Sequence, residues 1–87
     1  MVILRVYGMI RVLAGRDEIS VDASSPYEVL KKACEMLGME AERLVFDKSG
    51  KVYPSMLVSV NDTSISNLDA PISKNSIVHL IPAVEGG

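Results

Sequence analysis

One segment near the middle of the chain carries a complete set of helix signals. It reads SSPYEVLKKACEMLG and covers residues 24–38. Ser25 suits the N-cap, Pro26 the first helical position, and Glu28 the reciprocal position of a capping box. Gly38 is placed to end the helix in a left-handed conformation. The three-and-four spacing of one buried face is followed by Leu30, Ala33, Cys34 and Leu37.

Two segments before this helix have the alternating pattern of strands. VILRVYG, residues 2–8, places Val2, Leu4 and Val6 on one side, which we expect to face inward. RDEISVDA, residues 16–23, alternates more clearly and directs Ile19 and Val21 inward. The intervening GMIRVLAG, bounded by glycines, is predicted to form the hairpin connection between two antiparallel strands.

Two further strands are predicted after the helix. MEAERLVF, residues 39–46, is compatible with a short helical turn. VYPSMLVSVN, residues 52–61, is predicted as a strand with Val58 and Val60 inward and Leu57 outward. SIVHLI, residues 76–81, is the last predicted strand, and Pro82 is expected to stop its ladder pairing.

The order of these elements predicts an α+β domain in two layers. We expect a mixed sheet of four to five strands with one main helix packed on one face. If the two strand pairs share one sheet, the first and last strands lie side by side in its centre. The predicted domain covers residues 1–81, and residues 82–87 form a flexible tail that ends in Gly-Gly.

The uncovered face of this sheet is a candidate docking surface. If Val78 and Leu80 point at the helix, Ile77, His79 and Ile81 point away from it. With Leu57, and with Ile3 and Tyr7 on the first strand, they would form an exposed apolar area of the kind that binds partners. A shift of one residue in parity would instead place Ile77 and Ile81 in the core, and both readings stay open on this pattern.

Composition excludes several classes of function. The net charge is −2 and the basic residues are scattered, so no nucleic-acid partner is expected. The longest charge-free stretch, residues 52–61, is too short to span a bilayer, so no membrane partner is expected. A single cysteine allows no internal disulfide, which fits a reducing, cytoplasmic setting.

The chain shows no active site of its own. His79 is the sole histidine and has no group near it in sequence to orient it. Cys34 falls on the predicted buried helix face, where a small apolar role is the default. There is no metal-ligand cluster and no glycine-rich phosphate loop, so we predict neither a metal site nor a bound cofactor.

The tail PAVEGG, residues 82–87, is the remaining candidate. Gly86 and Gly87 lack Cβ atoms, so such an end can thread a narrow channel and present its carboxylate inside another protein. A carboxylate is a poor acyl donor until it is activated, for example as an acyl-adenylate made from ATP. A separate enzyme would have to supply that step. The alternative is an incidental glycine-rich end or a remnant of cloning.

Together with this layout, the sequence resembles the β-grasp sulfur carriers, which are related in fold to ubiquitin. Within them it is most similar to the small subunits of molybdopterin synthase. The likeness is sharpest over residues 60–87, VNDTSISNLDAPISKNSIVHLIPAVEGG. The matching positions are Val60-Asn61, Leu68-Asp69, Pro71-Ile72, Pro82, Val84, Gly86 and Gly87. Near the start, RVLAG matches the family at Arg11, Leu13 and Gly15 and departs from it at Val12.

The resemblance implies a reaction cycle centred on Gly87. A ubiquitin-activating-enzyme-like adenylyltransferase would use ATP to adenylate the Gly87 carboxylate, and a sulfur donor would then convert it to a thiocarboxylate. Gly86, which has no side chain, would allow the end of the chain to enter a narrow channel. The acceptor would be the large subunit of molybdopterin synthase. The family places an apolar docking residue where Ile81 stands, which favours an outward Ile81. The candidate partner-binding residues are Leu57, Ile77, His79, Ile81, Pro82 and Val84.

Three alternatives to the molybdopterin pathway remain at this stage. A related carrier could serve thiamine synthesis or transfer-RNA thiolation. A ubiquitin-like modifier could be joined through Gly87 to lysines of other proteins. An interaction domain could carry these glycines incidentally. The first two share activation at the same carboxylate, so the tail alone does not separate them.

Overall fold

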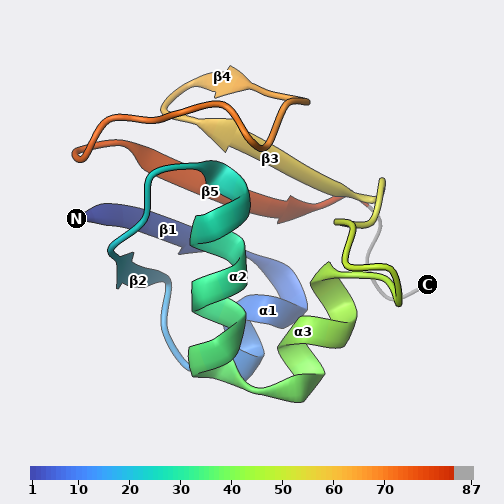
Figure 1. Cartoon of the computed structure of the whole chain (residues 1–87). Helices are drawn as coiled ribbons and strands as arrows, with labels where there is room; N and C mark the ends of the chain where they lie inside the picture. The colour runs from blue at the N-terminus through green and yellow to red at the C-terminus, as the bar shows by residue number, and fades with distance from the viewer. Residues whose placement is uncertain (84–87) are drawn as a thin grey trace.

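The computed structural model describes residues 1–83, which form a five-stranded sheet with three helices on one side of it (Figure 1). The elements in chain order are β1 (Val2–Val6), α1 (Gly8–Ala14), β2 (Glu18–Val21), α2 (Pro26–Leu37), α3 (Met39–Val45), β3 (Met56–Val60), β4 (Thr63–Ser64) and β5 (Ile77–Pro82). The predicted α+β class with a mixed sheet is confirmed, and α2 is the main helix of the prediction.

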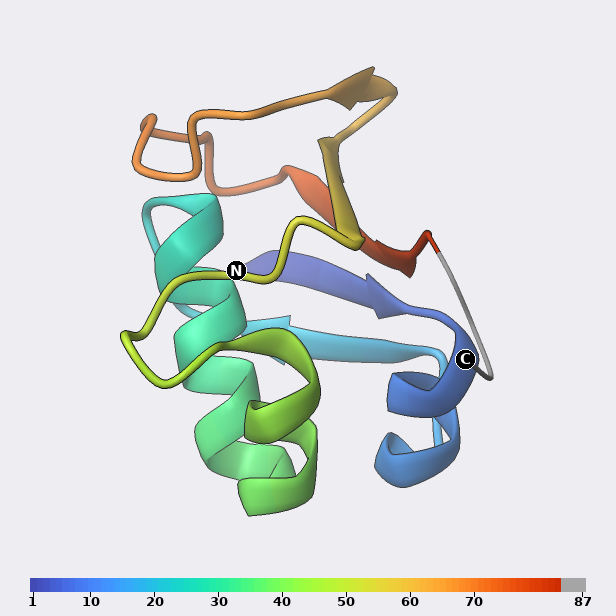
Figure 2. The ribbon, with the colours of Figure 1, turned by 90° about the vertical axis from the view of Figure 1, so that its right-hand side faces the viewer.

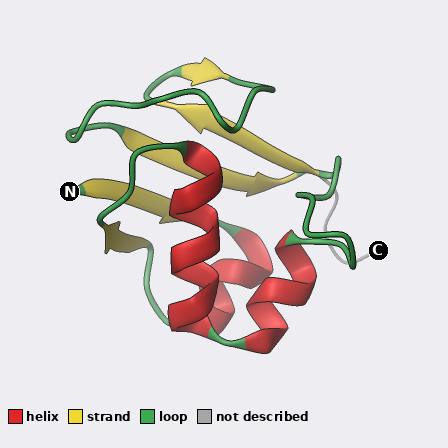
Figure 3. Cartoon of the chain, in the orientation of Figure 1, coloured by secondary structure: helices red, strands yellow, loops and turns green. Residues whose placement is uncertain are grey.

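The strand order is β2-β1-β5-β3-β4. β1 pairs with β2 in antiparallel fashion and with β5 in parallel, and β5 pairs with β3 in antiparallel fashion. The first and last strands are therefore neighbours in the centre of the sheet, as predicted. Figure 3 shows the sheet and the helices as two separate layers. No helix within residues 1–83 has the length and apolar character to cross a membrane.

The signals at the ends of α2 act nearly as predicted. Ser25 is the N-cap, and its hydroxyl accepts a hydrogen bond from the backbone N–H of Glu28 at 3.2 Å. The Glu28 carboxylate accepts from the backbone N–H of Ser24 at 2.8 Å, one residue earlier than in a standard capping box. Gly38 has a positive φ of 105° with ψ of −179°, so it lies outside the left-handed helical region that we predicted for it.

The segment between β1 and β2 is a helix and not the hairpin turn that we predicted. Figure 2 shows α1 directly after the end of β1, next to the returning chain. Gly8 and Gly15 both have positive φ, at 63° and 70°, and they stand at the two ends of this helix. Ile10 is its one buried residue and anchors it in the core. The two strands are antiparallel neighbours, as expected, although a helix connects them.

The core lies between the sheet and the helices. It contains the predicted inward residues of the strands except Val60, which is partly buried and packs against the core. Strands β1 and β2 contribute Val2, Leu4, Val6, Ile19 and Val21, and strands β3 and β5 contribute Val58, Val78 and Leu80. Helix α2 adds Val29, Leu30, Ala33 and Cys34 to this cluster. Because every helix covers the same side, the opposite side of the sheet, which we call the open face, is left without a covering layer of secondary structure among residues 1–83.

Candidate functional site

The outward side chains of β5 lie on the open face. Ile77 and Ile81 are each 37% exposed, whereas Val78 and Leu80 between them are at most 2% exposed. Leu57 on the neighbouring β3 is 52% exposed. The parity that directs Ile77 and Ile81 outward is therefore correct, and the alternative that placed them in the core is wrong.

Strand register arranges the open face in three rows. Leu57 stands opposite Ile81 at the end of the sheet where β5 finishes, and we call this pair the tail-side row. Ile3 stands opposite Ile77 at the other end, which we call the far row. Between them runs a polar row of Glu18, Arg5, His79 and Ser59, paired in sequence across four strands. The single apolar area that we expected is therefore divided by polar side chains.

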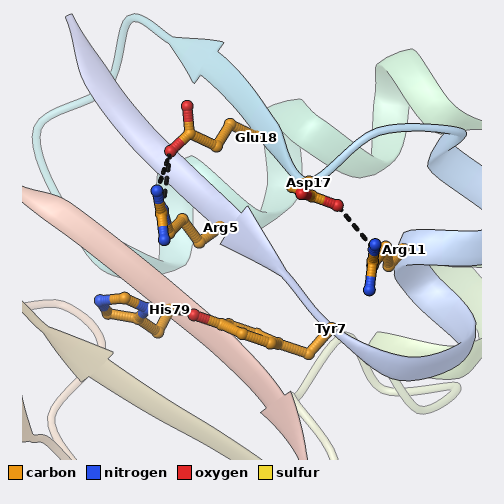
Figure 4. A network of polar contacts seen from close by, with 6 residues as sticks. All are labelled: Arg5, Tyr7, Arg11, Asp17, Glu18 and His79. Carbon is orange, nitrogen blue, oxygen red and sulfur yellow. Dashed lines mark hydrogen bonds and ion pairs between the residues drawn. The ribbon is translucent and has the colours of Figure 1, made fainter.

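The first half of the polar row is a hydrogen-bonded ion pair. Arg5 and Glu18 are cross-strand partners on β1 and β2, and both Nε and an Nη of Arg5 lie 2.7 Å from the same carboxylate oxygen. This contact with Glu18 raises the pKa of Arg5 above its usual value. A second surface pair, Arg11 with Asp17 at 2.6 Å, lies close by where α1 leads back to the sheet (Figure 4).

The second half of the polar row is fixed by a contact from outside the row. Tyr7, directly after β1, directs its hydroxyl to within 2.8 Å of Nδ1 of His79, and this contact is partly buried (Figure 4). The two rings are stacked, with centroids 5.9 Å apart and planes at 29°. His79 therefore has an orienting group after all, although the two residues lie 72 positions apart in the chain.

A shallow hollow adjoins His79 on the side of β3 and β4. Its lining combines the tail-side row with polar side chains, and its members are Leu57, Val58, Ser59, Asn61, Asp62, Ser64, His79 and Ile81. The hollow is open to solvent and has apolar and polar contact area side by side. Such a composition suits a protein side chain better than an enclosed small molecule.

β5 continues one residue further than we predicted before the described chain ends. Pro82 is the last strand residue and stands opposite Met56, and the N–H of Ala83 donates to the carbonyl of Ser55 at 2.6 Å. The sheet pairing thus extends past the proposed domain boundary at residue 81. Val84, Gly86 and Gly87, which we named as candidate site residues, lie outside the described residues.

Other groups in the described part of the chain do not form a catalytic site. Cys34 is buried on α2, and burial together with the charge of Glu42 raises the pKa of its thiol to about 11, so it is held as an unreactive thiol near neutral pH. No cluster of metal-ligating side chains occurs within residues 1–83. A groove lies on the helix side, between α3 and the 47–53 segment, and its lining carries both signs of charge, including Lys31, Glu42, Arg43, Asp47 and Lys48.

Reasoning from sequence found the open face but missed its polar interactions. Arg5 and Glu18 were available as outward residues of adjacent antiparallel strands, and opposite charges at such positions commonly pair. The contact between Tyr7 and His79 depends on the parallel register of β1 and β5, which no local pattern encodes.

These features together define the class of fold. A mixed sheet in which two antiparallel pairs are joined through a parallel central pair, with a helix crossing one face, is the β-grasp arrangement of ubiquitin-like proteins. The chain therefore has a ubiquitin-like β-grasp fold, which confirms the fold that the resemblance implied.

Several solved structures have a fold similar to that of this chain. SAMP1 from Haloferax volcanii has a TM-score of 0.86 to this chain at 21% identity, covering 99% of this chain and 98% of that one. A chain of the BexX/CysO complex from Amycolatopsis orientalis has a TM-score of 0.80 at 22% identity over 100% of both chains. A chain of the complex of subunits 1 and 2 of the molybdopterin-converting factor from Helicobacter pylori has a TM-score of 0.60 at 23% identity, covering 99% and 97%. No protein-family model and no curated protein sequence matches the chain.

Proposed function

We propose that this chain is a sulfur carrier whose sulfur is held at Gly87. The observation that carries the proposal is the position of the last described residues. β5 ends beside the exposed Leu57 and Ile81, and the sequence then supplies five residues, 83–87, that finish in Gly86-Gly87. A partner that binds the tail-side row is thereby in position to receive the end of the chain.

The chemistry at Gly87 requires the carboxylate to be the end of the mature protein. An oxygen of that carboxylate attacks the α-phosphorus of ATP on a separate adenylyltransferase, and pyrophosphate leaves. A donor of sulfide then attacks the acyl carbon, so that the new C–S bond forms as the bond to AMP breaks. The products are AMP and a thiocarboxylate on Gly87. The folded domain contributes recognition, and the other enzyme contributes catalysis.

For the destination of the sulfur we propose the large subunit of molybdopterin synthase. Two observations support it: the match of the carboxyl-terminal third to that family's motifs, and the similar fold of a chain in the Helicobacter pylori complex named above. The decisive test is co-expression of the full chain with that large subunit from the same organism. Stable co-purification is expected, and a failure to associate would contradict this destination while leaving the carrier function open.

The carrier function has its own test. After co-expression with the adenylyltransferase of the same organism, the intact mass of the chain should rise by the difference between sulfur and oxygen. The matched control is a chain that lacks Gly86 and Gly87, which should show no such change. An unmodified wild-type chain in the presence of an active adenylyltransferase and a sulfide donor would contradict the proposal.

A second candidate function is conjugation of Gly87 to lysines of other proteins. The observation in its favour is the higher TM-score to SAMP1, 0.86, than to the chain from the molybdopterin-converting factor, 0.60. Solved structures of SAMP1 are named as a small archaeal modifier protein. Tryptic peptides in which a lysine carries the chain's terminal residues would support this candidate, and they would be absent if the chain only carries sulfur.

A further inference from the structure

The contact between Tyr7 and His79 determines which ring nitrogen of His79 faces outward. The Tyr7 hydroxyl lies 2.8 Å from Nδ1 of His79. A phenol is a stronger hydrogen-bond donor than acceptor, and an unprotonated imidazole nitrogen is a good acceptor, so we assign the hydroxyl hydrogen to this contact. In the neutral ring the proton then resides on Nε2. Within residues 1–83, no hydrogen-bond partner of Nε2 is present.

We propose that the Nε2–H group of His79 is a fixed donor, and that it donates a hydrogen bond to an uncharged acceptor on the activating enzyme. The inference rests on the proposed function and adds a recognition element to it. The donor is held in orientation by the contact with the Tyr7 hydroxyl and by the stacking of the two rings. The acceptor that fits is a carbonyl oxygen, beside an apolar side chain that covers Leu57 and Ile81.

We infer that the activating enzyme covers the surface around His79, because the chain after Ala83 is short. Four residues, 84–87, span at most about 14 Å when fully extended. An enzyme that holds the Gly87 carboxylate must therefore approach within about that distance of Ala83. The tail-side row lies at that end of the sheet, and His79 is two residues before Ile81 on β5, roughly 7 Å along the strand. A contact surface of ordinary size covers both.

The charges around His79 favour an uncharged acceptor over a carboxylate. Arg5 already has its carboxylate partner in Glu18, so the polar row carries no spare positive charge beside a neutral His79. Asp62 lines the hollow next to His79 and would repel a second carboxylate placed there. A carbonyl oxygen meets neither difficulty, and its desolvation on docking is offset by the bond to Nε2–H.

The experiment measures ATP–pyrophosphate exchange by the adenylyltransferase of the same organism, with the full chain as protein substrate. His79→Leu removes the donor and keeps an apolar side chain, and His79→Gln places an amide nitrogen close to where Nε2 stands. We expect His79→Leu to raise the KM for the chain by roughly tenfold and to leave kcat unchanged. His79→Gln should restore KM to within about threefold of wild type. Ser20→Ala, on the same face of the edge strand β2, is the matched control and should behave as wild type.

A second measurement tests the orienting contacts without the enzyme. Nitrogen NMR of the free chain should show the Nε2–H form of His79, and Tyr7→Phe should shift the ring toward a mixture of the two neutral forms. Urea unfolding of each variant establishes that it is folded. A predominantly Nδ1–H ring in the wild-type chain would overturn the inference.

The outcomes separate this inference from the function on which it rests. Absence of exchange with the wild-type chain contradicts the proposed function itself. Normal exchange that His79→Leu leaves unchanged, or that His79→Gln fails to rescue, overturns the inference alone. A KM that falls as the pH is lowered, in the wild type and not in His79→Gln, would indicate a carboxylate acceptor and overturn the proposal of an uncharged acceptor.

Discussion

Leu57 and Ile81 stand directly opposite each other in the antiparallel ladder of β3 and β5, and both side chains are exposed on the open face. Apolar side chains that pair across strands and remain in contact with water stabilise the fold little. Their burial by a partner would add the hydrophobic gain of the area that is still exposed. The pair is therefore better placed for binding than for folding.

The first prediction concerns Ile81→Asp. Because the Ile81 side chain is 37% exposed, an aspartate can keep its charge in water, and we expect a loss of less than about 1 kcal/mol in the free energy of unfolding. Binding to the activating enzyme should fall far more, since a charge would be buried against an apolar contact. Urea unfolding and a pull-down with the adenylyltransferase measure the two effects.

The control for that prediction is the next residue along the strand. Leu80→Asp inserts a carboxylate at a position that is 2% exposed in the core, and it should prevent stable folding. If Ile81→Asp destabilised the domain as strongly as Leu80→Asp, Ile81 would have to be a core residue, and its assignment to the docking surface would be wrong.

The second prediction concerns removal of Gly86 and Gly87. The buried cluster within residues 1–83 ends at Leu80, so the shortened chain should unfold at the same urea concentration as the full chain. Adenylation and sulfur loading should be abolished, because the reacting carboxylate would be displaced along the chain. Intact mass after co-expression with the adenylyltransferase measures the loading. A clear loss of stability would mean that these residues support the fold.

The helix α1 shows where prediction from sequence reaches its limit. The α2 helix has twelve residues, a capping serine and a full buried stripe, so its local signals agree with one another. α1 has seven residues, too few to establish a helical period, and a glycine at each end resembles turn punctuation. Its formation depends on tertiary contact through Ile10, which no local pattern encodes.

The candidate site, like the fold, could be predicted from the sequence only in part. The alternation of β5 and β3 predicted that Ile77, Ile81 and Leu57 would be outward, and period-two patterning suffices for that. The polar row required the register of four strands, and the contact between Tyr7 and His79 required the parallel pairing of the two ends of the chain. Such long-range relationships are absent from any window of the sequence.

The third prediction concerns Gly38, where α2 passes into α3. Its φ of 105° with ψ of −179° lies in a region that is essentially restricted to glycine. A Cβ at this position would meet no atom within 4 Å, so the cost of Gly38→Ala is backbone strain alone, of order 1–3 kcal/mol. Thermal or urea unfolding gives the difference.

Gly15 supplies the comparison for Gly38, because it lies in the left-handed helical region at φ 70° and ψ 15°. Asparagine tolerates that region, so Gly15→Asn should cost less than Gly15→Ala. At Gly38 asparagine offers no such relief, and Gly38→Asn should be about as destabilising as Gly38→Ala. Equal tolerance of asparagine at both glycines would show that Gly38 can relax into the left-handed conformation.

The fourth prediction concerns the pH dependence of stability that Cys34 contributes. Burial, reinforced by the charge of Glu42, raises the thiol pKa from 9.0 to about 11 in the folded protein. The folded state thus binds this proton more tightly than the unfolded chain does, so the contribution is complete below pH 9 and is lost as the pH rises through about 11. Urea unfolding at several pH values should show a less steep decline for Cys34→Ala than for wild type. Cys34 is the one titratable group that differs between the two proteins, so parallel pH profiles would mean that the buried thiol ionises as it does in the unfolded chain.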